Sequence, residues 1–168
     1  MHNLKPSKVL VIFIFLITAN GVFAMSLNNA GKVCLFSSMT GSIKLDGVPV
    51  ANARLIRTVD RNGERTDETT TDKDGYFEFP GIFERTVTKF LPQEFVVSQE
   101  ITVVHNEKNY RIWVGVKRKP EENAEAKGRP LIIDCELNSE KRFIQVNGGP
   151  IMTFCTWDVE ADVIDTGF

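Results

Sequence analysis

The sequence predicts an all-β protein built as an antiparallel β-sandwich, and three observations support this. Short runs that alternate apolar and polar residues, the period of a half-buried strand, recur after residue 32. Turn-forming pairs such as Asp46-Gly47 and Asn62-Gly63 separate these runs at short intervals. Helical periodicity is nearly absent. Many short strands with frequent turns are typical of two packed antiparallel sheets.

The first 24 residues are expected to form a secretory signal peptide. Lys5 and Lys8 precede an apolar stretch, which ends in the small-x-small pattern Val22-Phe23-Ala24 that signal peptidase cuts. The uninterrupted apolar segment, residues 9–18, is too short for the roughly 20 residues of a membrane-spanning helix. Cleavage would leave residues 25–168 as a single β-sandwich domain that is periplasmic or secreted.

Charge and hydropathy limit the classes of partner. The chain holds 20 basic and 22 acidic residues, and two of the basic ones belong to the signal, so the net charge falls from −2 to −4 on cleavage. A mildly acidic protein has no general attraction for nucleic acid or anionic lipid. No long apolar segment follows the signal, so the mature form is not expected to span a membrane.

Each strand is predicted from its own pattern, beginning with the clearest. In the run 53–59, every second residue from Ala53 to Val59 lies on one face. The run 95–105 alternates in the same way. The run 110–116 places Tyr110, Ile112, Val114 and Val116 on the core face, with Arg111 and Trp113 opposite. The run 65–71 is polar and rich in Thr, which indicates an edge strand. The other expected strands are residues 33–45, 76–79, 131–137, 142–146 and 151–159.

Two segments between strands carry further predictions. Residues 117–130 are strongly polar and are expected to form a long exposed loop, in which Glu121–Ala126 could form a helical turn. Asp74-Gly75 is expected to be a two-residue hairpin turn with Gly75 at positive φ, which only glycine adopts without strain.

Three cysteines, Cys34, Cys135 and Cys155, follow the signal. In an oxidising compartment one disulfide is expected and one thiol is left over. The pair Cys135–Cys155 is favoured because both residues lie in strand-like runs near the C-terminus, which would leave Cys34 as a small buried apolar residue. The spacing matches no zinc motif.

Three motifs occur in order between residues 33 and 82. Gly41–Ile43 opens a strand with Gly-x-(apolar), Asp46–Ala53 reads Asp-Gly-x-Pro-(apolar)-x-x-Ala, and Thr69–Phe77 reads Thr-x-Thr-Asp-x-x-Gly-(aromatic)-(aromatic). This order resembles the carboxypeptidase regulatory-like domain of the transthyretin-like, or prealbumin-like, group. The resemblance implies a sandwich of seven or more strands outside the cytoplasm, with an accessory role and no activity. Glu84–Phe95 departs from the pattern, so the following residues are expected to be an extension.

No catalytic, cofactor or metal site is predicted. The segment 72–75 begins like a calcium loop, but the next residues continue as a strand, so a structural turn is expected. His105 has no nucleophile in a suitable context. There are four candidate partner-binding residues. Trp113 lies beside Arg111 on one strand, and Trp157 and Phe168 lie near the C-terminus. Aromatic and Arg side chains often anchor protein interfaces.

The sequence therefore predicts a non-enzymatic extracytoplasmic binding protein whose partner is another protein of the cell envelope. An immunity-type inhibitor of a secreted toxin is one form of this function. The alternative is an envelope module that binds carbohydrate or another small ligand, because exposed Trp and Tyr rings can stack on sugars.

Overall fold

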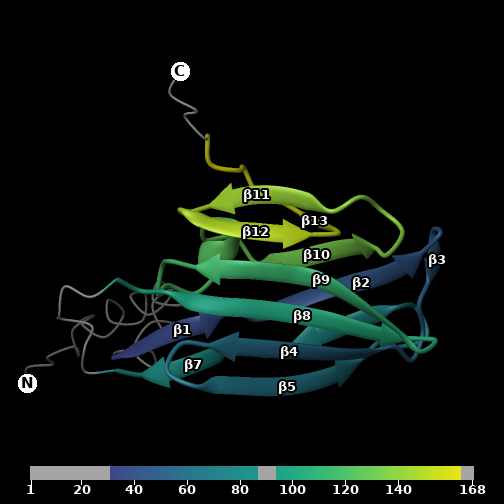
Figure 1. The fold of residues 1–168 in the computed structure, drawn as a ribbon, viewed down its shortest axis with the longest axis horizontal. Coiled ribbons are helices and arrows are strands. Elements are labelled where there is room, and N and C mark those ends of the chain that lie inside the picture. The colour runs from purple at the N-terminus through teal and green to yellow at the C-terminus, as the bar shows by residue number, and fades with distance from the viewer. Residues whose placement is uncertain (1–30, 87–93, 164–168) are drawn as a thin grey trace, which may run out of the picture. The chain divides into compact units, whose positions relative to one another are not determined.

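The protein is an all-β sandwich with antiparallel sheets. A computed structural model describes residues 31–86 and 94–163. The expected signal peptide and Phe168 lie outside these residues. The larger sheet faces the viewer in Figure 1 and has six strands. Their order is β11 (Arg142–Val146), β12 (Gly149–Thr153), β9 (Lys108–Lys117), β8 (Val97–His105), β4 (Arg54–Asp60) and β5 (Glu64–Thr70).

A five-stranded sheet and a two-stranded sheet complete the domain. Four strands of the five-stranded sheet follow the order β13 (Cys155–Trp157), β10 (Leu131–Glu136), β2 (Met39–Leu45) and β3 (Val48–Pro49). The fifth strand, β6 (Tyr76–Phe79), also pairs with β2. β1 (Lys32–Phe36) pairs with β7 (Ile82–Arg85). The pairing of β10 with β2 is parallel, which the expectation of an antiparallel sandwich did not include.

Alternating residues from the sheets form the core. On β4, Leu55 and Val59 are buried as predicted, and the edge position of β5 is also as predicted. On β6, Phe77 and Phe79 pack edge to face with their ring centroids 6.0 Å apart. Because apolar area removed from water stabilises the fold by about 25 cal/mol per Å², these inward-facing side chains hold the sheets together.

Arg57 lies on this same core face and is fully buried. Its guanidinium donates two hydrogen bonds to Asp67, on the neighbouring edge strand, and one to the Pro80 carbonyl oxygen. The guanidinium carbon is 4.4 Å from the centroid of the Phe79 ring and 5.2 Å from that of the Phe36 ring. These contacts allow a charged side chain to occupy an apolar position of the alternation.

The alternation predicted for residues 110–116 is wrong, and a β-bulge is the reason. Thr102 pairs with Arg111 whereas Ile101 pairs with Trp113, so Ile112 is an extra residue on β9. An extra residue reverses the faces that follow it. Trp113 therefore points into the core, and Val114 lies on the outer face with intermediate exposure.

Two predicted strands are each divided into two in the structure. The run 151–159 forms β12 and β13, which belong to different sheets, so the chain crosses the sandwich at Phe154. The run 33–45 forms β1 and β2, which also belong to different sheets. A crossing of this kind leaves the local alternation of apolar residues largely intact, so the sequence pattern shows one strand.

Gly75 has the predicted positive φ, +75°, but the predicted hairpin is wrong. β5 and β6 lie in different sheets, so the turn between them carries the chain across the sandwich. The Asp72 carboxylate accepts hydrogen bonds from the backbone N–H groups of Asp74 and Tyr76. Gly75 donates to the Asp72 carbonyl oxygen and accepts from the Ile43 N–H, which places this turn against β2.

Gly75→Ala should destabilise the protein more than Gly47→Ala. Both glycines have nearly the same φ, +75° and +77°, so the cost of a left-handed alanine, about 1–2 kcal/mol, is shared. A Cβ at Gly75 would lie 2.6 Å from the Ile43 carbonyl oxygen, whereas one at Gly47 would have open space. Urea unfolding of both variants measures the difference, and equal stabilities would contradict the packing of this turn against β2.

Candidate functional site

A groove of about 560 Å³ lies on the outer face of the six-stranded sheet, the face turned away from the core. All six strands of this sheet contribute residues to its lining. Its apolar lining includes Val114, Val116, Phe143, Pro150 and Met152, and its acidic lining is Asp60, Glu64 and Glu100. Phe143 is 66% exposed, which is unusual for a large aromatic residue.

The register of the strands orders the groove from apolar to acidic. One row of directly paired residues crosses the sheet from β11 to β4, and its members are Phe143, Met152, Val114, Glu100 and Thr58. A neighbouring row runs from β9 to β5 through Val116, Ser98, Asp60 and Glu64. Apolar side chains thus cover β11, β12 and β9, while carboxylates lie over β8, β4 and β5. Figure 1 shows these strands side by side in the sheet.

The three carboxylates of the groove differ in their partners. Glu100 accepts hydrogen bonds from Arg111 at 2.6 Å and from the Thr102 hydroxyl at 3.2 Å. Asp60 accepts one backbone hydrogen bond, from Gly63 at 3.2 Å. Within the described part of the chain, neither Asp60 nor Glu64 forms an ion pair. The acidic end of the groove therefore carries uncompensated negative charge.

The structure assigns different roles to the predicted partner-binding residues. Trp113 is fully buried and cannot contact a partner, because the bulge turns it into the core beside Phe36 and Trp157. Arg111 is exposed and lines the groove. Trp157 is partly buried, and its indole N–H donates to the Glu125 carbonyl oxygen at 3.0 Å. The groove residues on β11 and β12 were not predicted, because their position beside β9 depends on pairing between distant segments.

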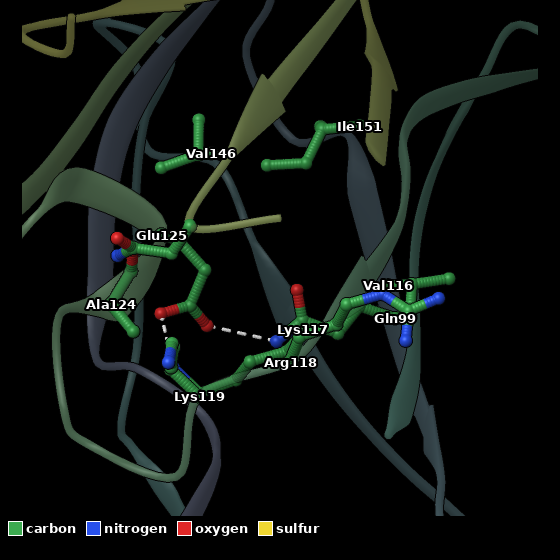
Figure 2. Close-up of a pocket in the computed structure, with 10 residues that line it drawn as sticks. Gln99, Val116, Lys117, Arg118, Lys119, Ala124, Glu125, Val146 and Ile151 are labelled. Carbon is green, nitrogen blue, oxygen red and sulfur yellow. Dashed lines mark hydrogen bonds and ion pairs between the residues drawn. The ribbon is translucent and has the colours of Figure 1, made fainter. Parts of the chain in front are cut away.

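The segment 117–130 is exposed over much of its length, as predicted, but it contains a buried ion pair. Residues 124–126 form a short 3-10 helix, η3 (Ala124–Ala126), whose residues are buried. The Glu125 carboxylate accepts from the Lys117 ammonium at 2.5 Å (Figure 2). It also accepts from Gln99 and from the Ser37 hydroxyl. One carboxylate thus fixes the loop to β8, to β9 and to the connection between β1 and β2.

The Lys117–Glu125 pair has a structural role. Their side chains are only 1% and 3% exposed, and the cavity beside them measures about 10 Å³, room for about one water molecule. Such a space does not admit a substrate, so these groups brace the fold and do not form an active site. The sequence signal was a Glu between two alanines in an otherwise charged stretch.

Acid should remove the contribution of Glu125 to stability. Burial alone would raise the pKa of Glu125, but attraction to Lys117 and hydrogen bonds from Lys117, Ser37 and Gln99 together hold that pKa below its ordinary value of 4.5. A depressed folded-state pKa gives stability that is present above the ordinary value and lost as the pH falls below it. The difference in urea stability between wild type and Glu125→Gln should therefore shrink below pH 4.5. A difference independent of pH would contradict this.

The predicted disulfide is confirmed, since Cys135 and Cys155 are bonded and face each other on β10 and β13. Cys34 is free and buried, also as predicted. Burial raises the pKa of the Cys34 thiol to about 11.

Cys34 should resist alkylation in the folded protein. The reactive species is the thiolate, and both burial and the raised pKa suppress it. Iodoacetamide followed by intact-mass measurement should show no adduct on native protein and one adduct after denaturation without reductant. An adduct formed rapidly on native protein would contradict the buried position.

Among residues 31–86 and 94–163, no group of three or more His, Cys, Asp or Glu side chains is placed to hold a metal ion. His105 lies at the β8–β9 hairpin, where its Nε2 is 3.0 Å from the Asn106 side-chain amide. None of the described helices has the length and apolar character needed to cross a membrane.

Comparison with known proteins gives one match. A family model, the domain of unknown function DUF6795, matches residues 39–140. No curated protein and no solved structure matches the chain. The matched segment runs from β2 to the turn after β10 and includes the acidic end of the groove and the Lys117–Glu125 pair. It covers more than half of the sequence, so the chain belongs to the DUF6795 family.

Proposed function

We propose that this chain is a non-enzymatic extracytoplasmic binding protein that holds another protein on the outer face of its six-stranded sheet. The groove on that face, with the exposed ring of Phe143 at its apolar end, is the observation that carries the proposal. Protein interfaces combine apolar contacts with polar ones, and the groove places an apolar end and an acidic end on one surface. Aromatic side chains such as Phe143 often supply the anchor of such a site.

The disulfide supports the extracytoplasmic part of the proposal. Disulfides persist in secreted and periplasmic proteins and are rare in the cytosol, where thiols are kept reduced. The bond between Cys135 and Cys155 joins two strands of the sandwich, which agrees with an oxidising compartment. Export also agrees with the charged and apolar start of the chain.

An immunity-type inhibitor is one form of this function. Such an inhibitor would bind a secreted toxin through the groove and block its activity. A toxin gene directly upstream of the gene for this protein would support this form. The carbohydrate alternative has weaker support, because Trp113 is buried and the Trp157 indole N–H already has a partner. These two rings and Tyr110, which is partly buried, were its candidates for stacking on a sugar.

Affinity capture from the envelope fraction of the protein's own source tests the proposal. The matched pair of variants is Phe143→Asp, in the groove, and Ile132→Asp, on the outer face of the other sheet, where Ile132 is 61% exposed. A partner retained by wild type and Ile132→Asp but lost with Phe143→Asp is the expected result. A partner lost equally with both variants, or with neither, would overturn the groove as the binding site.

A further inference from the structure

We infer that the groove accepts an extended segment of a partner protein that carries an apolar anchor and, a few residues away, a basic side chain. This inference rests on the proposed function and names the chemistry of the occupant. The apolar end over β9, β11 and β12 is lined by Val114, Met152 and Phe143, whereas the opposite end over β4 and β5 is lined by Asp60 and Glu64. A ligand that fits both ends must itself change from apolar to basic along its length.

The unpaired carboxylates select the sign of that charge. Three carboxylates line the groove against one cation, Arg111, and this cation is bound to Glu100. Asp60 and Glu64 face each other across the β4–β5 pairing, so two negative charges lie close together. Like charges on paired positions are unfavourable, and a Lys or Arg of the partner would relieve the repulsion while gaining two acceptors.

The strand spacing sets the distance between the two features of the ligand. Met152 on β12, in the middle of the apolar end, is three strands away from Asp60 on β4 and four strands from Glu64 on β5. Paired strands are about 4.8 Å apart, and an extended chain advances about 3.4 Å per residue, so the separation of about 14–19 Å spans about four to six residues. The basic residue should therefore stand about four to six positions from the apolar anchor.

A phage-displayed library of random peptides tests both the groove and its chemistry. Selection on the mature protein should enrich peptides that carry Phe, Leu or Met together with Lys or Arg. The basic residue should stand at that spacing on either side of the apolar one. The double variant Asp60→Asn/Glu64→Gln should bind the selected peptides about three- to tenfold more weakly at low salt, the sum of two exposed ion pairs. Its matched control is Glu78→Gln, on the exposed outer face of the other sheet, which should change binding less than twofold.

The outcomes separate this inference from the proposed function. If the selection yields no peptide, or if Phe143→Asp leaves peptide binding unchanged, the groove is not a protein-binding site and the inference fails with it. Peptides that bind through the groove but lack basic residues, or whose binding is unaffected by Asp60→Asn/Glu64→Gln, would overturn the inference alone. Basic-apolar peptides that lose affinity with both variants and as salt rises support it.

Discussion

Lys117→Met should destabilise the protein by about 3–5 kcal/mol, the usual cost of removing one partner of a buried ion pair. The Glu125 carboxylate would stay buried, with its hydrogen bonds from Ser37 and Gln99 but no compensating charge. Methionine keeps the length and apolar stem of lysine, so the loss reports the charge and not a cavity. Urea unfolding monitored by tryptophan fluorescence measures it, because Trp113 and Trp157 both lie close to the pair.

Two further variants isolate the cause. Arg118→Met removes the neighbouring cation, which is 39% exposed and pairs with Glu94 at the surface, so its cost should stay below about 1 kcal/mol. Lys117→Met combined with Glu125→Gln should recover much of the loss, because the amide oxygen can still accept from Ser37 while no charge remains. Equal stability of the Lys117 and Arg118 variants would refute the structural role of the buried pair.

Replacing both bonded cysteines by alanine should cost about 3 kcal/mol, because the bond closes a loop of 20 residues in the unfolded chain. β13 has only three residues and pairs with β10 alone among the described strands, so the bond also secures Trp157 against Trp113. Wild type under reducing conditions should lose the same stability as Cys135→Ala/Cys155→Ala. A loss below about 1 kcal/mol would mean that strand pairing alone holds β13.

Local patterns predicted the strands well where the chain stays in one sheet. Leu55 and Val59 on β4 follow the alternation, and the polar strand β5 is an edge strand as its composition required. The disulfide was also predicted, because Cys135 and Cys155 both lie in strand-like runs near the C-terminus.

The failures have physical causes that no single segment reveals. The bulge at Ile112 depends on its pairing with β8, and one extra residue was enough to move Trp113 from the surface to the core. The burial of Glu125 depends on Lys117 and on Gln99 from a distant strand, so its stretch appeared to be an exposed loop. The groove requires β11 and β12 beside β9, which only the complete sheet shows.

Kinship with the regulatory-like domains remains a proposal. Gly41 lies on β2 against β10, where a Cβ would be 2.3 Å from the Ile133 carbonyl oxygen, and Gly47 and Gly75 both have positive φ. The positions that carry the resemblance therefore have structural reasons to be glycine in this chain. An experimental structure of a regulatory-like domain with the same parallel pairing of β2 and β10 would support the relationship.

The most direct test of the binding surface is photo-cross-linking inside the producing cell. A benzoylphenylalanine placed at Phe143 or at Ile132 puts the same reactive group on the outer face of the six-stranded or the five-stranded sheet. Both positions are exposed, at 66% and 61%, so the comparison is matched. The proposed function predicts a discrete cross-linked partner from position 143 and none from position 132. A partner captured only from position 132 would contradict it.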